Sequence, residues 1–288
     1  MDITDITISK SLFERYVPAF RVPGSEDDSD AWDAMTAPMA TAKNKLLALF
    51  GDNVGDYIED TTAEQYWFAV QYICVTAARD ALAGADVILT ENGFGVVSND
   101  HIAPASRERV EALALQLRRD ASDSADNLLL LLRQTDWATT GIGLVNAKRW
   151  FYCPTYCRRI GIEAPEHRPL RREEYDEMEP RLREAEALAR RLWADELIDA
   201  IVAKVLLPYG SITYDVPYYC AAANNIEAFM VAHIRGEHHA EKLWERETYR
   251  YLQSNKDSLS EWASSEQYTA YNSTHYANKK HDTTYFFG

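Results

Sequence analysis

The feature that most constrains the fold is a pair of segments, residues 32–54 and 175–197, that align without a gap. Five positions of this alignment are identical, and they join Asp33, Met35, Ala42, Leu49 and Asp52 to Asp176, Met178, Ala185, Leu192 and Asp195. Residues 70–79 and 226–235 form a second similar pair, and each half then continues into a long charged segment. Because the matches keep the same order, we expect a duplicated unit and two similar halves.

Helical periodicity dominates both halves. In the second half apolar residues recur at three- and four-residue spacing, as in an amphipathic helix. They include Leu182, Ala185, Leu188, Ala189 and Leu192. In the first half Thr61 and Glu64 have the spacing of a capping box and predict a helix over 62–83. The other expected helices cover 104–119, 124–133, 225–234 and 240–255. The sequence therefore predicts a mainly α protein.

One segment, residues 87–97, departs from the helical pattern and predicts a small β-hairpin. Two short apolar runs flank Asn92 and Gly93, a dipeptide that favours a two-residue turn. A lone two-stranded hairpin is only marginally stable in water. It must therefore pack on its own helices, gain a strand from elsewhere in the chain, or pair with a neighbouring molecule. The final TTYFFG, residues 283–288, is a candidate extra strand.

These patterns divide the chain into four parts. Residues 1–134 hold the first helical repeat with the hairpin, residues 135–174 form a basic and aromatic connecting segment, and residues 175–263 form the second repeat. Residues 264–288 are polar, rich in tyrosine and almost free of aliphatic side chains, so they cannot build a core of their own. We expect a C-terminal arm that orders against a partner or adds a strand to a sheet edge, with a frayed terminus as the alternative.

Charge and composition exclude several classes of protein. The chain has 30 Lys and Arg residues against 45 Asp and Glu residues, a formal charge of −15, which disfavours general binding to nucleic acid. Four cysteines are too few for a disulfide framework and suit a reducing compartment. The N-terminus has no basic and apolar leader, and no apolar run approaches the roughly 20 residues that span a bilayer. We expect a soluble protein without a membrane partner.

The sequence carries no convincing motif for catalysis or cofactor binding. The GFG run at 93–95 lacks the lysine and hydroxyl of a phosphate-binding loop, so a turn explains it better. On an unbroken helix, His233, Glu237 and Glu241 would share one face and could hold a cation. However, Gly236 weakens that helix, and the spacing matches no established metal motif. We therefore expect no enzyme, no cofactor and no metal, with a helical metal-dependent enzyme as the alternative.

A local excess of positive charge lies in the connecting segment. Its basic residues are Lys148, Arg149, Arg158, Arg159, Arg168, Arg171 and Arg172, and its interleaved aromatic residues are Trp150, Phe151, Tyr152 and Tyr156. Basic and aromatic side chains together suit either a protein interface or single-stranded nucleic acid. A third interpretation is a linker whose aromatics join the core while its arginines remain solvated. In so acidic a chain, an interface in which Arg158 and Arg159 meet an acidic face of another copy is favoured over nucleic acid.

The stretch LTENGFGVVSNDHIAPASRERVEAL, residues 89–113, resembles an uncharacterised family of structural proteins of tailed phages and prophages of gut bacteria, encoded near capsid and tail genes. The echoing halves and the terminal YFFG also resemble that family. Residues 92–95 match its turn, and Pro104 and Ser106 match the start of its helix. The resemblance implies a virion part, a head–tail connector in the neck between portal and tail, and it carries over no catalytic residues.

The sequence therefore predicts a non-enzymatic assembly protein that forms a ring of identical copies in a virion, after assembly in the host cytoplasm. Its expected partners are further copies of the chain, the portal protein, and tail or other neck proteins. DNA is expected to pass through the ring without specific binding. An accessory protein that binds single-stranded nucleic acid is a second alternative. The candidate assembly interface comprises Asn92, Gly93, Phe94, Gly95, Arg158, Arg159, Tyr285, Phe286 and Phe287.

Overall fold

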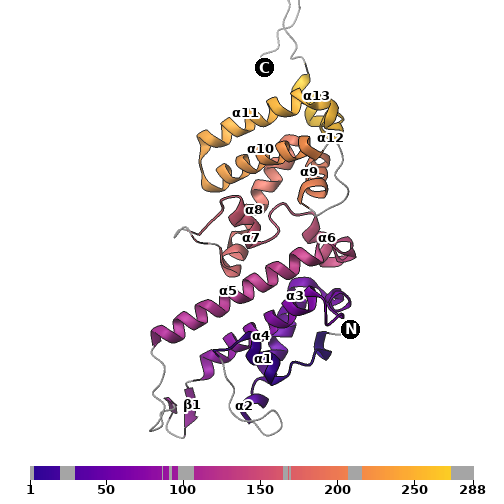
Figure 1. Ribbon diagram of the computed structural model, residues 1–288. Helices are drawn as coiled ribbons and strands as arrows, with labels where there is room; N and C mark the ends of the chain where they lie inside the picture. Colours follow the sequence, from indigo (N-terminus) through magenta and orange to yellow (C-terminus); the bar gives the residue numbers. More distant parts are fainter. Residues whose placement is uncertain are drawn as a thin grey trace, which may run out of the picture. The chain divides into compact units, whose positions relative to one another are not determined.

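The computed structural model describes residues 3–19, 30–85, 87–90, 93–96, 107–164, 168, 170–206 and 216–273. It contains two compact units, Met1–Glu177 and Met178–Gly288 (Figure 1). Both units are built mainly from helices, which confirms the prediction of a mainly α protein. None of the helices in these ranges is both long and apolar enough to cross a membrane.

Three long helices form the body of the first unit, and shorter elements surround them. The short elements are η1 (Ile3–Asp5), α1 (Lys10–Tyr16), α2 (Asp30–Asp33), η2 (Asp52–Tyr57), η3 (Asp136–Thr139), α6 (Gly141–Ala147) and α7 (Pro154–Arg159). The long helices are α3 (Thr36–Phe50), α4 (Glu64–Ala85) and α5 (Arg107–Leu132), and α4 packs against both others. Helix α8 (Arg172–Trp193) begins in this unit and continues into the second.

Helix α4 is the centre of the first unit because it is apolar around most of its circumference. Residues 72–78 are all buried, including the fully buried Ile73 and Cys74. A helix of this kind must be covered on every side. Phe50 of α3 and Leu128 of α5 are among the buried side chains of the helices that cover it. Burying one large apolar side chain stabilises a fold by roughly 1.5–3 kcal/mol, so these contacts hold the three helices together.

Helix α5 runs unbroken through a stretch where the sequence predicted two helices, over 104–119 and 124–133. That prediction is wrong, because the polar residues between the two segments continue the helix. The Ser124 hydroxyl donates to the Asp120 carbonyl oxygen at 2.6 Å, a bond within the helix. The buried apolar stripe also crosses the polar run, and its members are Leu117, Ala121, Ala125, Leu128, Leu129 and Leu132.

The aromatic residues of the connecting segment belong to the first unit. Trp150, Phe151 and Tyr156 are each at most 3% exposed. The Tyr175 hydroxyl donates to the Phe151 carbonyl oxygen at 2.7 Å and ties the segment to the start of α8. These rings therefore present no face on which a base or a partner could stack. Of the three interpretations of the segment, the linker with core aromatics fits the structure best.

The second unit is organised around an aromatic cluster. Its elements are the later part of α8, α9 (Asp195–Ile201), the π-helical segment η4 (Val202–Leu206), α10 (Val216–Arg235), α11 (His238–Ser254), η5 (Lys256–Ser258), α12 (Ser260–Ala263) and α13 (Glu266–Asn272). The buried Trp193 meets Phe229 edge to face, with ring centroids 4.8 Å apart. Tyr249 makes a second edge contact with Trp193 and donates its hydroxyl to the Leu192 carbonyl oxygen at 2.9 Å. The cluster thus joins α8, α10 and α11.

The segment that the sequence assigns to a C-terminal arm, residues 264–288, is folded over its first part. Ser265 caps α13 by accepting the backbone N–H of Tyr268 at 3.0 Å. The Tyr271 ring stacks on Tyr249, with centroids 4.8 Å apart. Tyrosine rings thus supply contacts that aliphatic side chains would otherwise make, and residues 265–272 belong to the folded second unit. The candidate strand at 283–288 lies outside the described residues.

The two units share a local pattern at positions that the sequence alignment pairs. Helix α3 ends at Phe50 and is followed by Gly51 at φ 84° and ψ 165°. Helix α8 ends at Trp193 and is followed by Ala194 at φ 79° and ψ 144°. A short helix, η2 or α9, starts at the next residue, and two packed long helices follow. Because a positive φ is disfavoured for alanine, its recurrence at the paired position indicates the same chain path.

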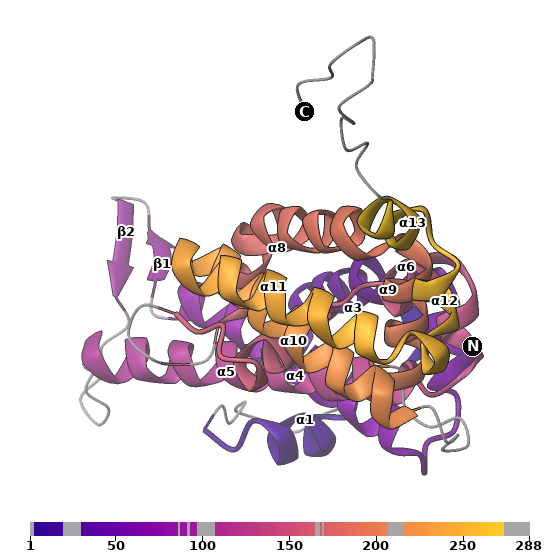
Figure 2. The ribbon, with the colours of Figure 1, turned by 90° about the horizontal axis from the view of Figure 1, so that it is seen from above.

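The connection between the two long helices differs between the units. In the second unit α10 and α11 are joined by Gly236 and Glu237 alone. In the first unit the strands β1 (Val87–Thr90) and β2 (Gly93–Val96) lie between α4 and α5 in the chain and pair antiparallel. They lie at the end of the helix pair where α4 stops and α5 starts (Figures 1 and 2).

The register of the two strands differs from the one that the turn dipeptide predicts. Leu89 lies opposite Phe94, and Thr90 lies opposite Gly93. Gly93 is thus a strand residue, and the prediction that Asn92 and Gly93 form the turn is wrong by one position. Residues 91 and 92, between the strands, lie outside the described part of the chain.

Candidate functional site

The structure does not gather the predicted interface residues into one place. Gly93, Phe94 and Gly95 lie in strand β2, whereas Arg158 and Arg159 lie in the last turn of α7. The other four predicted residues lie outside the described ranges. The strand pair and the arginines of α7 therefore have to be considered as separate sites.

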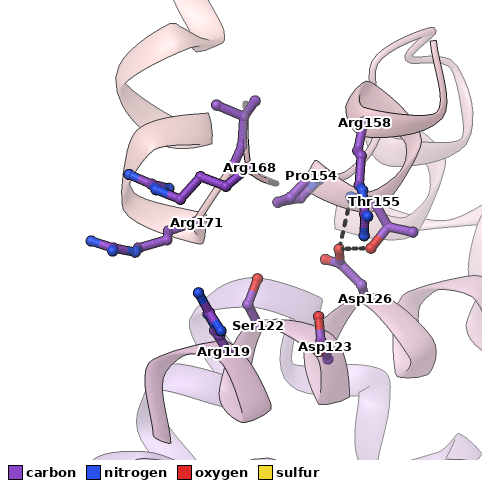
Figure 3. Close-up of a pocket in the computed structure, with 10 residues that line it drawn as sticks. Arg119, Ser122, Asp123, Asp126, Pro154, Thr155, Arg158, Arg168 and Arg171 are labelled. Atoms are coloured by element: carbon purple, nitrogen blue, oxygen red, sulfur yellow. Dashed lines mark hydrogen bonds between the residues drawn. The ribbon is translucent and has the colours of Figure 1, made fainter. Parts of the chain in front are cut away.

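Arg158 lines a pocket of about 250 Å³ in the first unit, together with three more arginines (Figure 3). Helix α5 contributes Arg119, and the segment immediately before α8 contributes Arg168 and Arg171. The other lining residues are Ser122, Asp123, Asp126, Pro154, Thr155 and Leu170. We call this cavity the arginine pocket. The guanidinium group of Arg159 lies instead over the ring of Tyr156, 4.5 Å from the ring centroid.

Glu174 fixes one wall of the arginine pocket. Its carboxylate accepts hydrogen bonds from both terminal guanidinium nitrogens of Arg168, with Nη1 and Oε2 2.7 Å apart. The backbone N–H of Arg171 donates to the same Oε2 at 2.8 Å. The hydrogen bond from Arg168 is the main reason that the pKa of Glu174 falls to about 2. A bidentate ion pair therefore holds this wall in place before any ligand arrives.

Replacing Glu174 by glutamine is expected to lower the free energy of unfolding at neutral pH by about 1 kcal/mol, because the pair is partly screened by solvent. The pKa is lower in the folded state than the ordinary value of 4.5, so the carboxylate stabilises the fold above that pH and loses this contribution as the pH falls toward about 2. Chemical denaturation of wild type and E174Q should show a difference at neutral pH that shrinks steadily with acidification.

Glu173→Gln is the matched control for this prediction. Its side chain is 58% exposed and lies 3.8 Å from its arginine partner, Arg79, so its removal should change stability little. A difference between wild type and E174Q that stays constant down to the lowest pH would show that the charge of Glu174 is not what stabilises the fold.

Two carboxylates line the same pocket, and their surroundings differ. Asp126 is 2% exposed and accepts two hydrogen bonds from Thr155, from Oγ1 at 2.6 Å and from the backbone N–H at 3.0 Å. These bonds join α7 to α5, and burial raises the pKa of Asp126. Burial also raises the pKa of Asp123, and the positive charges of Arg119 and Arg158 oppose that rise. Asp123 is therefore the carboxylate that interacts with the pocket arginines.

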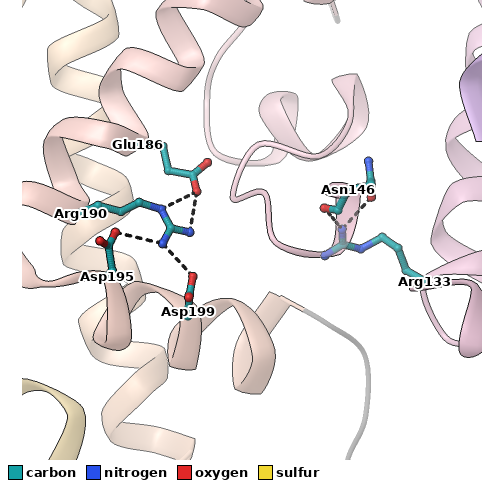
Figure 4. A network of polar contacts seen from close by, with 6 residues as sticks. All are labelled: Arg133, Asn146, Glu186, Arg190, Asp195 and Asp199. Carbon is teal, nitrogen blue, oxygen red and sulfur yellow. Dashed lines mark hydrogen bonds and ion pairs between the residues drawn. The ribbon is translucent and has the colours of Figure 1, made fainter. Parts of the chain in front are cut away.

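Arg133 shows a structural use of an arginine in the same unit (Figure 4). It is 3% exposed, and its Nη1 donates to the backbone oxygen and to Oδ1 of Asn146, both at 2.8 Å. Its guanidinium carbon lies 4.0 Å from the ring centroid of Tyr152. The side chain thus fastens the end of α5 to α6.

Arg190 has a comparable role in the second unit (Figure 4). Its guanidinium group binds Glu186 at 3.0 Å, Asp195 at 3.4 Å and Asp199 at 2.7 Å. The network spans the corner between α8 and α9, where Ala194 has its positive φ. Asp195 and Asp199 of α9 are thereby engaged in ion pairs that hold this corner.

The unbroken helix that would place His233, Glu237 and Glu241 on one face is not formed. Helix α10 ends at Arg235, and Gly236 takes a φ of 72°, so Glu241 belongs to the next helix. His233 Nδ1 lies 2.8 Å from Glu241 Oε1, while Glu237 lies near Arg235. In the part of the chain that the structure describes, no three His, Cys, Asp or Glu side chains are arranged to hold a metal ion. The alternative of a metal-dependent enzyme assumed that these three side chains share one face of a single helix, and the structure does not have that arrangement.

The helices and the arginine pocket define a mainly α protein with a basic cavity on an acidic chain. Residues 50–142 match the model of DUF6712, a family of unknown function. The match covers less than half of the chain, from the end of α3 to the start of α6, and includes both strands and α5. No curated protein and no solved structure matches the chain.

Sequence reasoning missed the arginine pocket, although one signal was present. Arg119, Ser122, Asp123 and Asp126 are spaced by three and four residues, which places them on one face of a helix. This polar stripe runs beside the apolar stripe of the same helix. A solvated helix surface has the same pattern, so spacing alone could not show that α7 and the segment before α8 line a pocket with it.

Proposed function

We propose that the protein is a non-enzymatic structural subunit that assembles with copies of itself into a ring, and that the ring is a head–tail connector in the neck of a phage particle. The observation that carries this proposal is the pair of strands between α4 and α5. The assignment to a phage particle rests on the resemblance of residues 89–113 to phage structural proteins. Portal, tail and other neck proteins would then be the neighbours of the ring.

The strand pair lengthens a connection that is short in the second unit. If the two units arose by duplication, α10 and α11 are the counterparts of α4 and α5. The connection of α10 to α11 consists of Gly236 and Glu237, and the two helices still pack closely. A long connection that the helices do not require is available for another role, and binding functions commonly lie on such connections.

The strand pair offers backbone hydrogen-bonding groups to a neighbouring molecule. Within the described residues the sheet consists of β1 and β2 alone, and neither outer edge is covered there by a third strand. Edge strands present N–H and C=O groups at regular spacing, and a strand of another chain can add to them. Such addition has a fixed direction, as a head-to-tail ring requires of every subunit.

Apolar positions on the strands and on α6 also favour a protein partner. The register joins Val87 with Val96 and Leu89 with Phe94, so four apolar positions share one face of the pair. Helix α6 carries three exposed apolar side chains, which are Ile142 (43% exposed), Leu144 (38%) and Val145 (55%). The exposed apolar side chains of α6 are typical of a contact with another protein.

The charge of the chain supports a connector better than a nucleic-acid-binding accessory. A formal charge of −15 would let DNA slide through a ring without sticking. Binding of single strands usually relies on exposed aromatic rings, whereas the rings of the basic segment are buried. The same burial removes them as anchors of a protein interface, so the proposal assigns assembly to the strands.

Sedimentation velocity of the purified protein, with electron microscopy of the same sample, tests this proposal. We expect association that depends on concentration and yields closed rings of one size. Tracing the chain in the density of a native particle would then identify its neighbours. A protein that stays monomeric up to its solubility limit, and that is missing from purified phage particles, would overturn the proposal.

A further inference from the structure

The arginine pocket is not needed for assembly through the strands, and its chemistry indicates a ligand. Four arginine residues line a cavity of about 250 Å³ on a chain with a formal charge of −15. A guanidinium group is planar and always charged, and its paired N–H groups match two oxygens of a phosphate. We propose that the arginine pocket binds a phosphate-class oxyanion, either inorganic phosphate or the phosphate group of a small molecule.

The wall of the pocket next to α8 is organised for such a ligand in advance. Glu174 holds the guanidinium group of Arg168 by two hydrogen bonds and the backbone of Arg171 by a third. Nε of Arg171 is buried, and no hydrogen-bond partner for it lies within the described residues. The guanidinium group of Arg168, which Glu174 fixes before binding, would lose little conformational entropy when it meets an anion. An anion would therefore bind to this side of the pocket at a low cost in conformational entropy.

The opposite wall contains the arginines of α5 and α7, and one carboxylate competes for them. Arg119 and Arg158 both interact electrostatically with Asp123. The other carboxylate, Asp126, is already engaged by Thr155 and lies 3.9 Å from Arg172, a cation outside the pocket lining. Figure 3 shows Arg119, Asp123 and Asp126 on α5, with Arg158 across the space from them. A doubly charged oxyanion would attract two arginines more strongly than the single charge of Asp123 does.

The size and surroundings of the pocket favour a small phosphate over a polymer. A cavity of about 250 Å³ accommodates a phosphate group with a few further atoms. The acidic chain around it repels an extended phosphate backbone. The Tyr152 and Tyr156 side chains near α7 are buried and offer no stacking surface for bases.

Isothermal titration calorimetry of the full chain with inorganic phosphate tests the proposal. Arg158→Gln should weaken binding about tenfold or more, because a hydrogen bond to a charged group is lost. Asp123→Asn should tighten binding at least about threefold, because the competing charge is removed. Arg109→Gln, an exposed arginine elsewhere on α5, is the matched control and should leave the affinity unchanged. The opposite signs of the first two effects separate a pocket ligand from nonspecific attraction to positive charge.

Two further titrations identify the source of the phosphate. Glycerol 3-phosphate that binds as tightly as inorganic phosphate, or more tightly, would indicate a phosphorylated small molecule, and weaker binding would indicate the free ion. Absence of binding to wild type would overturn the proposal, as would equal affinities of wild type and Arg158→Gln, or no tightening in Asp123→Asn. Binding only to a single-stranded oligonucleotide would also overturn it. Thermal unfolding of each variant shows whether it folds as the wild type does.

Discussion

Replacing residues 86–106 by a flexible linker of about six residues is expected to give a folded protein that no longer forms rings. Such a linker spans roughly 20 Å, which is enough to join neighbouring helices packed roughly 10 Å apart. The helices α4 and α5 keep their mutual packing, and the buried stripe of α5 is untouched. Since loop-closure entropy changes only by about 0.6 kcal/mol for each doubling of length, the unfolding midpoint should move little.

Sedimentation velocity measures whether rings form, and thermal unfolding measures whether the protein remains folded. The matched control is insertion of the same linker between Gly236 and Glu237, where the second unit makes its own connection. A Cβ added at Gly236 would meet no atom within 4 Å, so the site has space for a longer loop. The control should still form rings. Rings of normal size from the shortened protein would contradict assembly through the strands, and an unfolded product would show that the strands belong to the fold.

The helical body of the protein follows from the sequence because its signals are local. The helix predicted over 62–83 corresponds to α4, which begins at Glu64 and ends at Ala85, two residues later at each end. The paired segments at 32–54 and 175–197 likewise contain α3 and most of α8. Where local signals compete, the prediction fails. The polar run near Asp120 resembles a loop, and only the apolar stripe beside it shows that α5 continues.

The strand register and the arginine pocket show a different limit. The dipeptide Asn92-Gly93 predicts a turn at these two residues, yet Thr90 lies opposite Gly93, so the connection between the strands lies one position earlier in the chain. The pocket depends on contacts between distant segments, because Arg119 and Arg168 are separated by the second half of α5 and by all of α6 and α7. Their separation in the sequence does not predict that they line the same pocket. Such a site becomes visible only once tertiary packing is known.

Gly143→Ala is expected to destabilise the first unit by about 3 kcal/mol or more. A Cβ at this position would lie 1.9 Å from the carbonyl oxygen of Trp137 and 2.8 Å from its ring. Neither part of Trp137 can move aside easily. Its side chain is fully buried, and its Nε1 donates to the Phe50 carbonyl oxygen at 2.9 Å. Its carbonyl oxygen also accepts the backbone N–H of Thr140, which closes η3.

Gly141→Ala is the control that separates this clash from the general cost of losing a glycine. Gly141 has a φ of 53°, but an added Cβ would meet no atom within 4 Å. Its replacement should therefore cost only about 1 kcal/mol, the penalty of a left-handed conformation. Differential scanning calorimetry should show a midpoint lowered by roughly 6–12 °C or more for G143A and by roughly 2–4 °C for G141A. Equal midpoints would mean that η3 and α6 can separate, and that Trp137 does not fasten this corner to α3.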